Sequence, residues 1–187
     1  DDCSSRGLGD VYKRQNYEGA GTLEFLYENK EFYFIEMNTR IQVEHPVTEM
    51  ITGFDIVKAQ IKIALGINYD LDQRLITFKG HSIECRINAE DPETFEPCPG
   101  KITKMHTAGG FGIRYDSHIY GGYNVSPFYD SLLAKIITQA NSRKTAIKRM
   151  LSALDEFYVE GIKTNHSLHE KILICLLYTS DAADELS

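Results

Sequence analysis

The sequence predicts an α+β fold in two parts: a β-hairpin with helices, followed by a mostly β domain that carries a packed helix. The first part is indicated by two β-rich runs around a polar turn, after which apolar residues recur at helical spacing. The second part is indicated beyond Gly66, where short β-like runs alternate with turns rich in glycine and proline. We expect the first domain over residues 16–67 and the second over residues 68–175.

Composition narrows the class of protein. The 187 residues are 42% hydrophobic, which suits one medium domain or two small ones. The net charge is −7 and no dense cluster of lysine and arginine is present, so nucleic acid is not an expected partner. No apolar run approaches the roughly 18 residues of a membrane-spanning helix, and the first residues lack a signal-peptide pattern. We therefore expect a cytoplasmic protein with no membrane partner. The four cysteines show no paired spacing for zinc or disulfides.

The first domain opens with the predicted hairpin. Its two runs lie within residues 19–37 and are joined by a polar turn near residues 29–30. Residues 38–46 are expected to form a loop, because Pro46 disfavours helical backbone at His45.

Helices and strands follow in a regular order. A helix in two pieces is expected over residues 47–65, because Gly53 interrupts an otherwise helical apolar spacing. One further helix is expected to open at Ser142, a good N-cap residue. Its apolar stripe consists of Ala146, Ile147, Met150, Leu151 and Leu154. The strands of the second domain are expected at residues 82–87, 101–105, 111–115 and 132–138.

Two glutamates on the arms of the hairpin form a candidate metal site. An odd loop, for example residues 29–31, would place Glu24 directly opposite Glu36, whereas a two-residue loop would separate them. Facing carboxylates repel each other, so we expect a cation between them, and Mg²⁺ suits hard oxygen ligands and nucleotide phosphates. Asn38 could supply a third oxygen from the same face. The alternative is that both glutamates are solvent-facing residues of an amphipathic hairpin.

The loop that follows combines anion donors with a base. Arg40 offers a forked guanidinium to a small planar anion, and Gln42 and the Val43 N–H add further donors. Glu44 could remove a proton from such an anion.

Two alternatives stay open for this loop. His45 could be the base, although a lone histidine before a proline is more often structural. Arg40 and Glu44 could equally form a surface ion pair that contributes little to stability.

These residues resemble a known family. Residues 34–45 (FIEMNTRIQVEH) resemble the signature of biotin-dependent carboxylases of the ATP-grasp superfamily. Residues 84–92 (ECRINAEDP) resemble the start of the biotin carboxylase C-terminal domain, and residues 129–131 (YDS) resemble a later segment of it. The spacing also agrees, and the resemblance runs over residues 16–173. It implies the end of an ATP-grasp domain followed by a biotin carboxylase C-terminal domain.

The resemblance implies roles for the matching positions. Glu24 and Glu36 resemble ligands of Mg²⁺ (or Mn²⁺) and of the ATP phosphates. Asn38 resembles the ligand of a second metal, and Leu26 resembles a residue that contacts adenine.

The resemblance also implies the substrates. Arg40, Gln42 and Val43 resemble the bicarbonate site. Glu44 resembles the base that deprotonates bicarbonate, and Arg86 resembles the arginine that stabilises the biotin enolate. The implied enzyme is an ATP-dependent ligase that carboxylates biotin on a carrier protein through carboxyphosphate.

The implied partners are a biotin carboxyl carrier protein or domain, a carboxyltransferase and a second copy, which would bind near Arg114 to form a homodimer. We prefer a component of acetyl-CoA carboxylase, an enzyme of fatty acid biosynthesis, over a domain of a pyruvate or propionyl-CoA carboxylase. A non-catalytic dimerisation module is an alternative from another class. Another ATP-grasp ligase is also possible, but the stretch around Arg86 argues against it.

The two ends of the chain depart from the family. No glycine-rich phosphate loop precedes Gly19, and residues 1–15 and 176–187 show no sustained periodicity. We expect both segments to be non-native tails that pack poorly. Because half of the family's nucleotide clamp is not in this sequence, we expect the chain to be inactive by itself.

Overall fold

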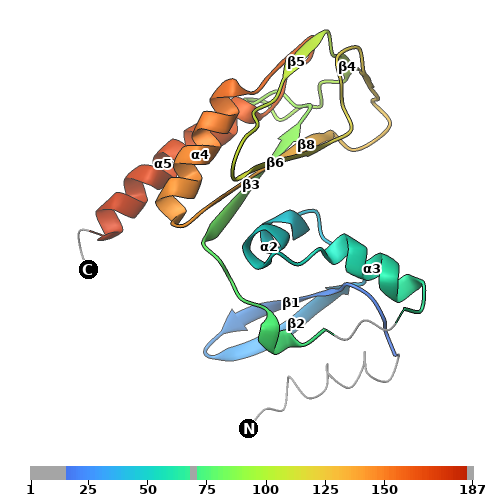
Figure 1. Cartoon of the computed structure of the whole chain (residues 1–187). Coiled ribbons are helices and arrows are strands. Elements are labelled where there is room, and N and C mark those ends of the chain that lie inside the picture. Colours follow the sequence, from blue (N-terminus) through green and yellow to red (C-terminus); the bar gives the residue numbers. More distant parts are fainter. Residues whose placement is uncertain (1–15, 68–70, 185–187) are drawn as a thin grey trace. The chain divides into compact units, whose positions relative to one another are not determined.

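The structure, a computed structural model, describes residues 16–67 and 71–184, and side chains as far as residue 176. Its mixture of helices and strands confirms the predicted α+β class (Figure 1). The chain divides into two compact units, of which the second begins at Thr77 and also takes in residues 50–52. Segments 1–15 and 185–187 of the two expected tails lie outside the described residues, and the origin of both tails stays a prediction.

The first unit contains the predicted hairpin. Strand β1 (Thr22–Glu28) pairs antiparallel with strand β2 (Glu31–Asn38). The two residues between them, Asn29 and Lys30, have φ values of 53° and 68°. Two consecutive residues with positive φ are typical of the type I′ turns that connect tightly twisted hairpins.

Two short helices follow the hairpin, as predicted. Helix α2 (His45–Thr52) ends at Gly53, whose φ of 70° is left-handed, and helix α3 (Ile56–Ala64) begins three residues later. The expected loop over residues 38–46 is wrong at both ends, because β2 continues through Asn38 and α2 already begins at His45. Pro46 occupies the first turn of the helix, where the missing N–H would have no helical partner in any case. A short 3-10 turn, η1 (Gln73–Leu75), closes the unit.

The second unit is built on a three-stranded antiparallel sheet. The strand order is β3 (His81–Asn88), β8 (Leu132–Ala140), β6 (Ile113–Ser117), so β8 is central. The strands expected at residues 82–87 and 132–138 are thereby confirmed. Two further strand pairs complete the unit, and they are β4 (Gly100–Lys101) with β7 (Asn124–Val125) and β5 (Lys104–His106) with β9 (Tyr158–Glu160).

Two expected strands differ from those observed. Residues 101–105 were expected to form one strand, but they divide between β4 and β5, which have different partners. The strand expected at residues 111–115 begins only at Ile113. The residue before it, Gly112, has a φ of 76°, which is not strand geometry.

Two helices pack beside each other in the second unit (Figure 1). Helix α4 (Arg143–Glu156) confirms the prediction: the Ser142 hydroxyl accepts the Thr145 N–H at 3.2 Å. Its predicted stripe is buried, apart from the partly buried Leu151. Helix α5 (His166–Asp184) was not predicted, and residues 176–184, expected to lack regular structure, belong to it. Neither glycine nor proline interrupts this span, so helical backbone can continue through it.

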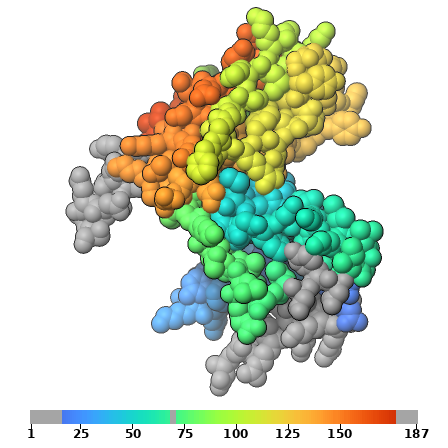
Figure 2. All heavy atoms as spheres, in the orientation of Figure 1, coloured from blue at the N-terminus to red at the C-terminus, as the bar shows by residue number. Residues whose placement is uncertain are grey.

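The hydrophobic core belongs to the second unit. It joins one face of β3 and β8 to the inner face of α4, around Ile87, Ile136 and Met150. The segments that carry β5, β6 and β7, yellow-green to gold in Figure 2, form much of the surface visible over this unit. In the described part of the first unit, by contrast, only Pro46 and Ala59 are buried. No helix among the described residues is both long and apolar enough to cross a bilayer.

Candidate functional site

Glu24 and Glu36 face each other across the hairpin, but not for the predicted reason. The turn has two residues, which would separate them in a regular ladder. The register, however, pairs Phe25 with Phe34 and then Glu24 with Glu36, so Ile35 is an extra residue in a β-bulge. A bulge shifts the register by one residue and changes which face a side chain occupies. The bulge therefore brings the two carboxylates together.

Asn38 links the two carboxylates to the loop. Its side-chain Nδ2 donates to Glu24 Oε1 at 2.8 Å and to Glu36 Oε1 at 3.2 Å. Its Oδ1 accepts from Arg40 Nη2 at 3.3 Å. The three predicted metal ligands are thus in mutual contact, and an amide donor lies where the two like charges would otherwise repel each other.

The donor set of this cluster fits a hard divalent cation. Two carboxylates and one amide supply oxygens, and rotation of the Asn38 amide would turn Oδ1 toward Glu24 and Glu36. No group of three histidine, cysteine or acidic residues with metal-binding spacing occurs in the described ranges, so this mixed set is the candidate. Leu26 lies two residues beyond Glu24 on β1 and is 63% exposed, which leaves it accessible to a ligand on the carboxylate face.

The predicted anion residues converge on one cavity of about 300 Å³. Inside the first unit, Arg40 Nη1 donates to Gln42 Oε1 at 2.7 Å and to the Ile41 carbonyl at 3.2 Å. Glu44 lines the same cavity, so a guanidinium, an amide and a carboxylate surround a space large enough for a small anion. The cavity is lined by Ala20, Gly21, Thr22, Arg40, Ile41, Gln42, Glu44, His45, Thr48 and Ile56. Val43 is not among these residues, and the role of its N–H stays a prediction.

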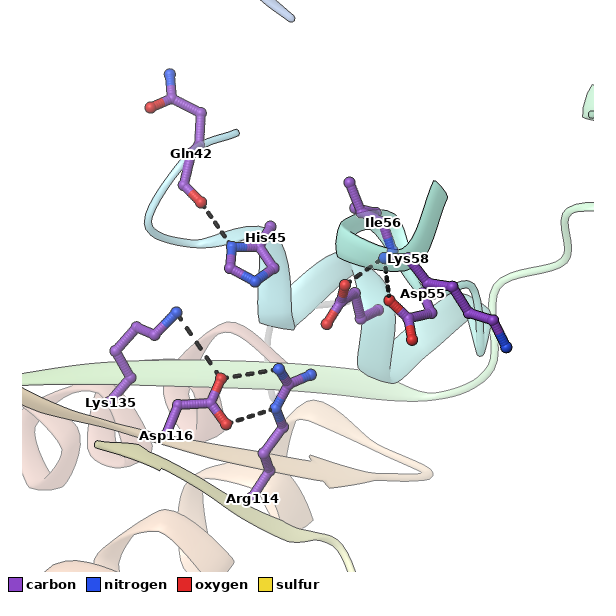
Figure 3. A network of polar contacts seen from close by, with 9 residues as sticks. Gln42, His45, Asp55, Ile56, Lys58, Arg114, Asp116 and Lys135 are labelled. Carbon is purple, nitrogen blue, oxygen red and sulfur yellow. Dashed lines mark hydrogen bonds and ion pairs between the residues drawn. The ribbon is translucent and has the colours of Figure 1, made fainter. Parts of the chain in front are cut away.

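His45 holds the loop in place. Its Nδ1 lies 2.7 Å from the Gln42 carbonyl, and because a carbonyl only accepts, Nδ1 is the donor (Figure 3). The backbone N–H of His45 bonds the same carbonyl at 3.3 Å. This double contact favours the structural role for His45 over that of a base.

Arg86 lies on β3 of the second unit, on the face opposite the core residues Cys85 and Ile87. Its side chain is 49% exposed, and its Nε lies 3.7 Å from Oε1 of Glu84, whose side chain is only 5% exposed. Lys135 stands directly across from Arg86 on β8. Arg86 therefore sits in a row of charges, with its guanidinium accessible to a ligand.

The charged row continues onto β6. Asp116 is the partner of Lys135 in the ladder, and the two side chains approach to 3.9 Å. Asp116 also receives two hydrogen bonds of 2.8 Å from Arg114, two residues before it (Figure 3). Arg114, which was expected near a dimer interface, thus has a fixed conformation on the sheet, and the interface itself stays a prediction.

Burial makes Cys85 an unreactive thiol. Burial, together with the adjacent Glu84 carboxylate, raises the pKa of Cys85 to about 12. A thiol with this pKa is not a nucleophile at neutral pH. The interpretation of the cysteines as ordinary thiols is consistent with this environment.

Two features of these sites were not predicted from the sequence. The segment Ala20-Gly21-Thr22 lines the anion cavity. The two glycines of Gly19-Ala20-Gly21 could have indicated this, because glycine is common where a backbone comes close to a ligand. Asn165 and His169 bond the backbone of Arg86, a contact that depends on the unpredicted helix α5.

Comparison with known families covers both units. A family model described as the biotin carboxylase C-terminal domain matches residues 84–184. Another, described as the ATP binding domain of the carbamoyl-phosphate synthase L chain, matches residues 8–73. The match to the C-terminal domain argues against another kind of ATP-grasp ligase.

Individual relatives agree with the family models. The chain is 64% identical over 157 residues to biotin carboxylase from Haemophilus influenzae, a match that covers 84% of this chain and 35% of that protein. It is 53% identical over 158 residues to a pyruvate carboxylase subunit from Methanothermobacter thermautotrophicus, covering 84% and 32%. The chain thus spans about a third of the length of these curated relatives.

Solved structures show the same relationship. The biotin carboxylase domain of a thermophilic 2-oxoglutarate carboxylase bound to bicarbonate matches with a TM-score of 0.83 and 50% identity, over 89% of this chain and 38% of that one. A Campylobacter jejuni biotin carboxylase in complex with an ATP analogue matches with a TM-score of 0.81 and 46% identity, over 92% and 40%. The C-terminal family model alone spans more than half of the residues. The chain therefore belongs to the biotin carboxylase family.

Proposed function

We propose that this chain supplies the metal, bicarbonate and biotin sites of a biotin carboxylase, which uses ATP to carboxylate biotin on a carrier protein. The observation that supports this most strongly is a continuous series of side-chain hydrogen bonds from Glu24 through Asn38 and Arg40 to Gln42. This series joins a carboxylate pair suited to a metal and nucleotide to a cavity suited to bicarbonate.

In the first step, ATP activates bicarbonate. Glu44 takes the proton of a bicarbonate that is held by Arg40 and Gln42, and a bicarbonate oxygen attacks the γ-phosphorus of ATP. The bond from that phosphorus to the bridging oxygen breaks, ADP leaves, and carboxyphosphate forms. Such a transfer depends on in-line positioning and charge neutralisation rather than on a covalent enzyme intermediate.

Glu24, Glu36 and Asn38 would hold the Mg²⁺ or Mn²⁺ that accompanies ATP. A metal bound there would supply positive charge to neutralise the phosphate oxygens. The protein's own contribution is to keep two carboxylates on one face of the hairpin, which the bulge at Ile35 achieves. Leu26, exposed on that face, would contact the adenine.

In the second step, biotin is carboxylated. Carboxyphosphate breaks its carbon–oxygen bond to give CO₂ and phosphate, and the ureido nitrogen of biotin attacks the CO₂. The proton that this nitrogen loses passes to the released phosphate, which is the available base. Negative charge gathers on the ureido oxygen of the enolised biotin, where the Arg86 guanidinium would stabilise it as an oxyanion-hole donor does.

The proposal extends to partners. Biotin reaches the site on a carrier protein or domain, a carboxyltransferase uses the product, and the complete enzyme is a cytoplasmic homodimer. A role in acetyl-CoA carboxylase, and hence in fatty acid biosynthesis, is the preferred assignment. A pyruvate or propionyl-CoA carboxylase is the alternative, since one relative is named as part of a pyruvate carboxylase.

A chimera tests the function. Residues 16–173 of this chain would replace the matching segment of the full-length Haemophilus influenzae biotin carboxylase, which is 64% identical to it. We expect the chimera to hydrolyse ATP in a bicarbonate-dependent manner that free biotin stimulates. Absence of both activities from a folded chimera would refute the proposal.

Two variants of the chimera separate the two steps. Glu44→Gln removes the base and should lower bicarbonate-dependent hydrolysis by about 100-fold or more. Arg86→Met should lower the biotin-stimulated rate by about 100-fold while leaving hydrolysis without biotin within about twofold. An equal loss in both assays for Arg86→Met, or unchanged hydrolysis for Glu44→Gln, would contradict the assigned roles.

A non-catalytic dimerisation module is the second candidate. It predicts that the 187-residue chain forms a stable dimer by light scattering and that Arg114→Glu makes it monomeric. A chain that is monomeric before this substitution would exclude the module.

A further inference from the structure

The start of helix α5 reaches the outer edge of strand β3 next to Arg86. Among the strands that the structure describes, β3 pairs only with β8, so backbone groups on its other side need other partners. Asn165 supplies them. Its Oδ1 accepts the Asn88 N–H at 2.9 Å, its Nδ2 donates to the Arg86 carbonyl at 3.2 Å, and its own N–H bonds the Asn88 carbonyl at 3.2 Å. This single residue therefore satisfies three backbone groups at the C-terminal end of the β3 edge.

His169 adds a second donor to the same carbonyl. It lies one helical turn after Asn165, and its Nε2 is 2.7 Å from the Arg86 carbonyl. Because the carbonyl only accepts, the tautomer must carry a proton on Nε2. The carbonyl of Arg86 thus accepts from Asn165, immediately before α5, and from His169 in the first turn of α5.

The location of this contact makes it relevant to the site. The ladder between β3 and β8 has an irregularity between Ile87 and Asn88, one residue beyond Arg86. The extra residue of this bulge is Leu133 on β8, and a bulge bends the ladder locally and alters the direction of nearby side chains. Asn165 spans this irregularity, from Arg86 to Asn88, and is only 8% exposed. The backbone from which the Arg86 guanidinium extends is therefore fixed by α5 as well as by the sheet.

We infer that Asn165 and His169 are positioning residues for biotin carboxylation, which hold the Arg86 backbone so that its guanidinium meets the ureido oxygen of biotin. The inference rests on the proposed function of Arg86. The physical basis is that a donor stabilises a transition state only if it is in place before charge develops. Displacement of the Arg86 backbone should therefore weaken stabilisation of the biotin enolate more than it weakens the binding of ATP or bicarbonate.

The test uses the full-length chimera and paired substitutions. His169→Gln keeps an N–H donor near the position of Nε2, whereas His169→Phe keeps a ring without a donor. Asn165→Asp keeps the acceptor for the Asn88 N–H but removes the donor to the Arg86 carbonyl. Lys171→Ala, on the exposed surface of the same helix, is the matched control.

We expect His169→Phe and Asn165→Asp to lower kcat/KM for free biotin by about three- to tenfold, the effect of losing one hydrogen bond. KM for ATP and for bicarbonate, and hydrolysis without biotin, should stay within about twofold. His169→Gln should recover most of the loss, and Lys171→Ala should have no effect. Thermal unfolding of each variant checks that the second unit remains folded.

Two results would overturn the inference alone. In an active chimera, equal behaviour of His169→Gln and His169→Phe would show that the donor is irrelevant. A loss spread equally over biotin, ATP and bicarbonate would show a general structural role. An unaltered chimera without activity would instead remove the proposed function, and the inference with it.

Discussion

At the scale of single residues, the burial of Cys85 has a measurable consequence for stability. Its pKa is raised to about 12, whereas an unfolded thiol titrates near 8.5. The thiol therefore contributes stability that is fully present below about pH 8.5 and is lost as the pH rises toward 12. We expect the free energy of unfolding to fall by about 1.4 kcal/mol per pH unit from this residue above pH 9.

Chemical denaturation between pH 8 and 10.5 measures this effect. Cys85→Ala should flatten the pH dependence relative to the unaltered chain. Cys175→Ala, which changes an exposed thiol, should leave the slope unchanged. Identical slopes for all three proteins would show that the Cys85 thiol ionises equally in both states.

At the scale of elements, the hairpin turn carries a residue in an unfavourable conformation. Lys30 has a φ of 68°, a region in which glycine has no steric penalty. We expect Lys30→Gly to stabilise the hairpin by about 0.5–1 kcal/mol, because type I′ turns favour Asn-Gly. Hydrogen exchange of the β1 and β2 amides should slow by about two- to fivefold. Lys58→Gly, at an exposed position of helix α3, is the control: it should destabilise α3 and speed the exchange of the α3 amides, because glycine is unfavourable in helical backbone.

The cap of helix α4 gives a second prediction at this scale. The Ser142 hydroxyl satisfies the Thr145 N–H, so Ser142→Ala should destabilise the second unit by about 1 kcal/mol. Urea unfolding followed by far-ultraviolet circular dichroism measures the change. Ser152→Ala in the same helix is the control: its hydroxyl only donates to the Lys148 carbonyl one turn earlier, and the expected change is within about 0.5 kcal/mol. Equal effects of the two substitutions would argue against a capping role.

Helix ends marked by a capping residue or a glycine could be predicted from the sequence, whereas features that depend on how two strands pair could not. The N-cap at Ser142 and the break at Gly53 are encoded within a few residues. The bulge at Ile35 is different, because β2 is almost uniformly apolar between Phe32 and Ile35 and such a strand does not specify its own register. The sequence therefore allowed Glu24 and Glu36 to be expected opposite each other, but it did not reveal the bulge that places them there.

At the scale of the whole molecule, the candidate sites also differ in whether their residues are close in the sequence or come from distant segments. Arg40, Gln42 and Glu44 follow one another in a single loop, so their convergence on one cavity was predictable from the chain. The contacts of Asn165 and His169 with Arg86 join residues about 80 positions apart. They require helix α5 to pack against β3, which no local pattern predicts.

The distribution of buried residues predicts unequal stability in the two units. The core lies in the second unit, whereas the hairpin of the first unit exposes large apolar side chains on both of its faces, among them Leu26, Tyr27, Phe32 and Ile35. A two-stranded hairpin is marginally stable unless further strands or helices cover a face. In the 187-residue chain, we expect the amides of β1 and β2 to exchange at least about 100-fold faster than those of β3, β8 and α4.

The full-length chimera provides the matched comparison, because its relative supplies the remaining two thirds of the enzyme. There we expect the β1 and β2 amides to become protected by a further factor of about 10 or more, since the added domain would cover apolar surface now exposed to water. The β8 amides, already in a complete core, should change little. Equal protection of the hairpin in both proteins would mean that the first unit is stable by itself.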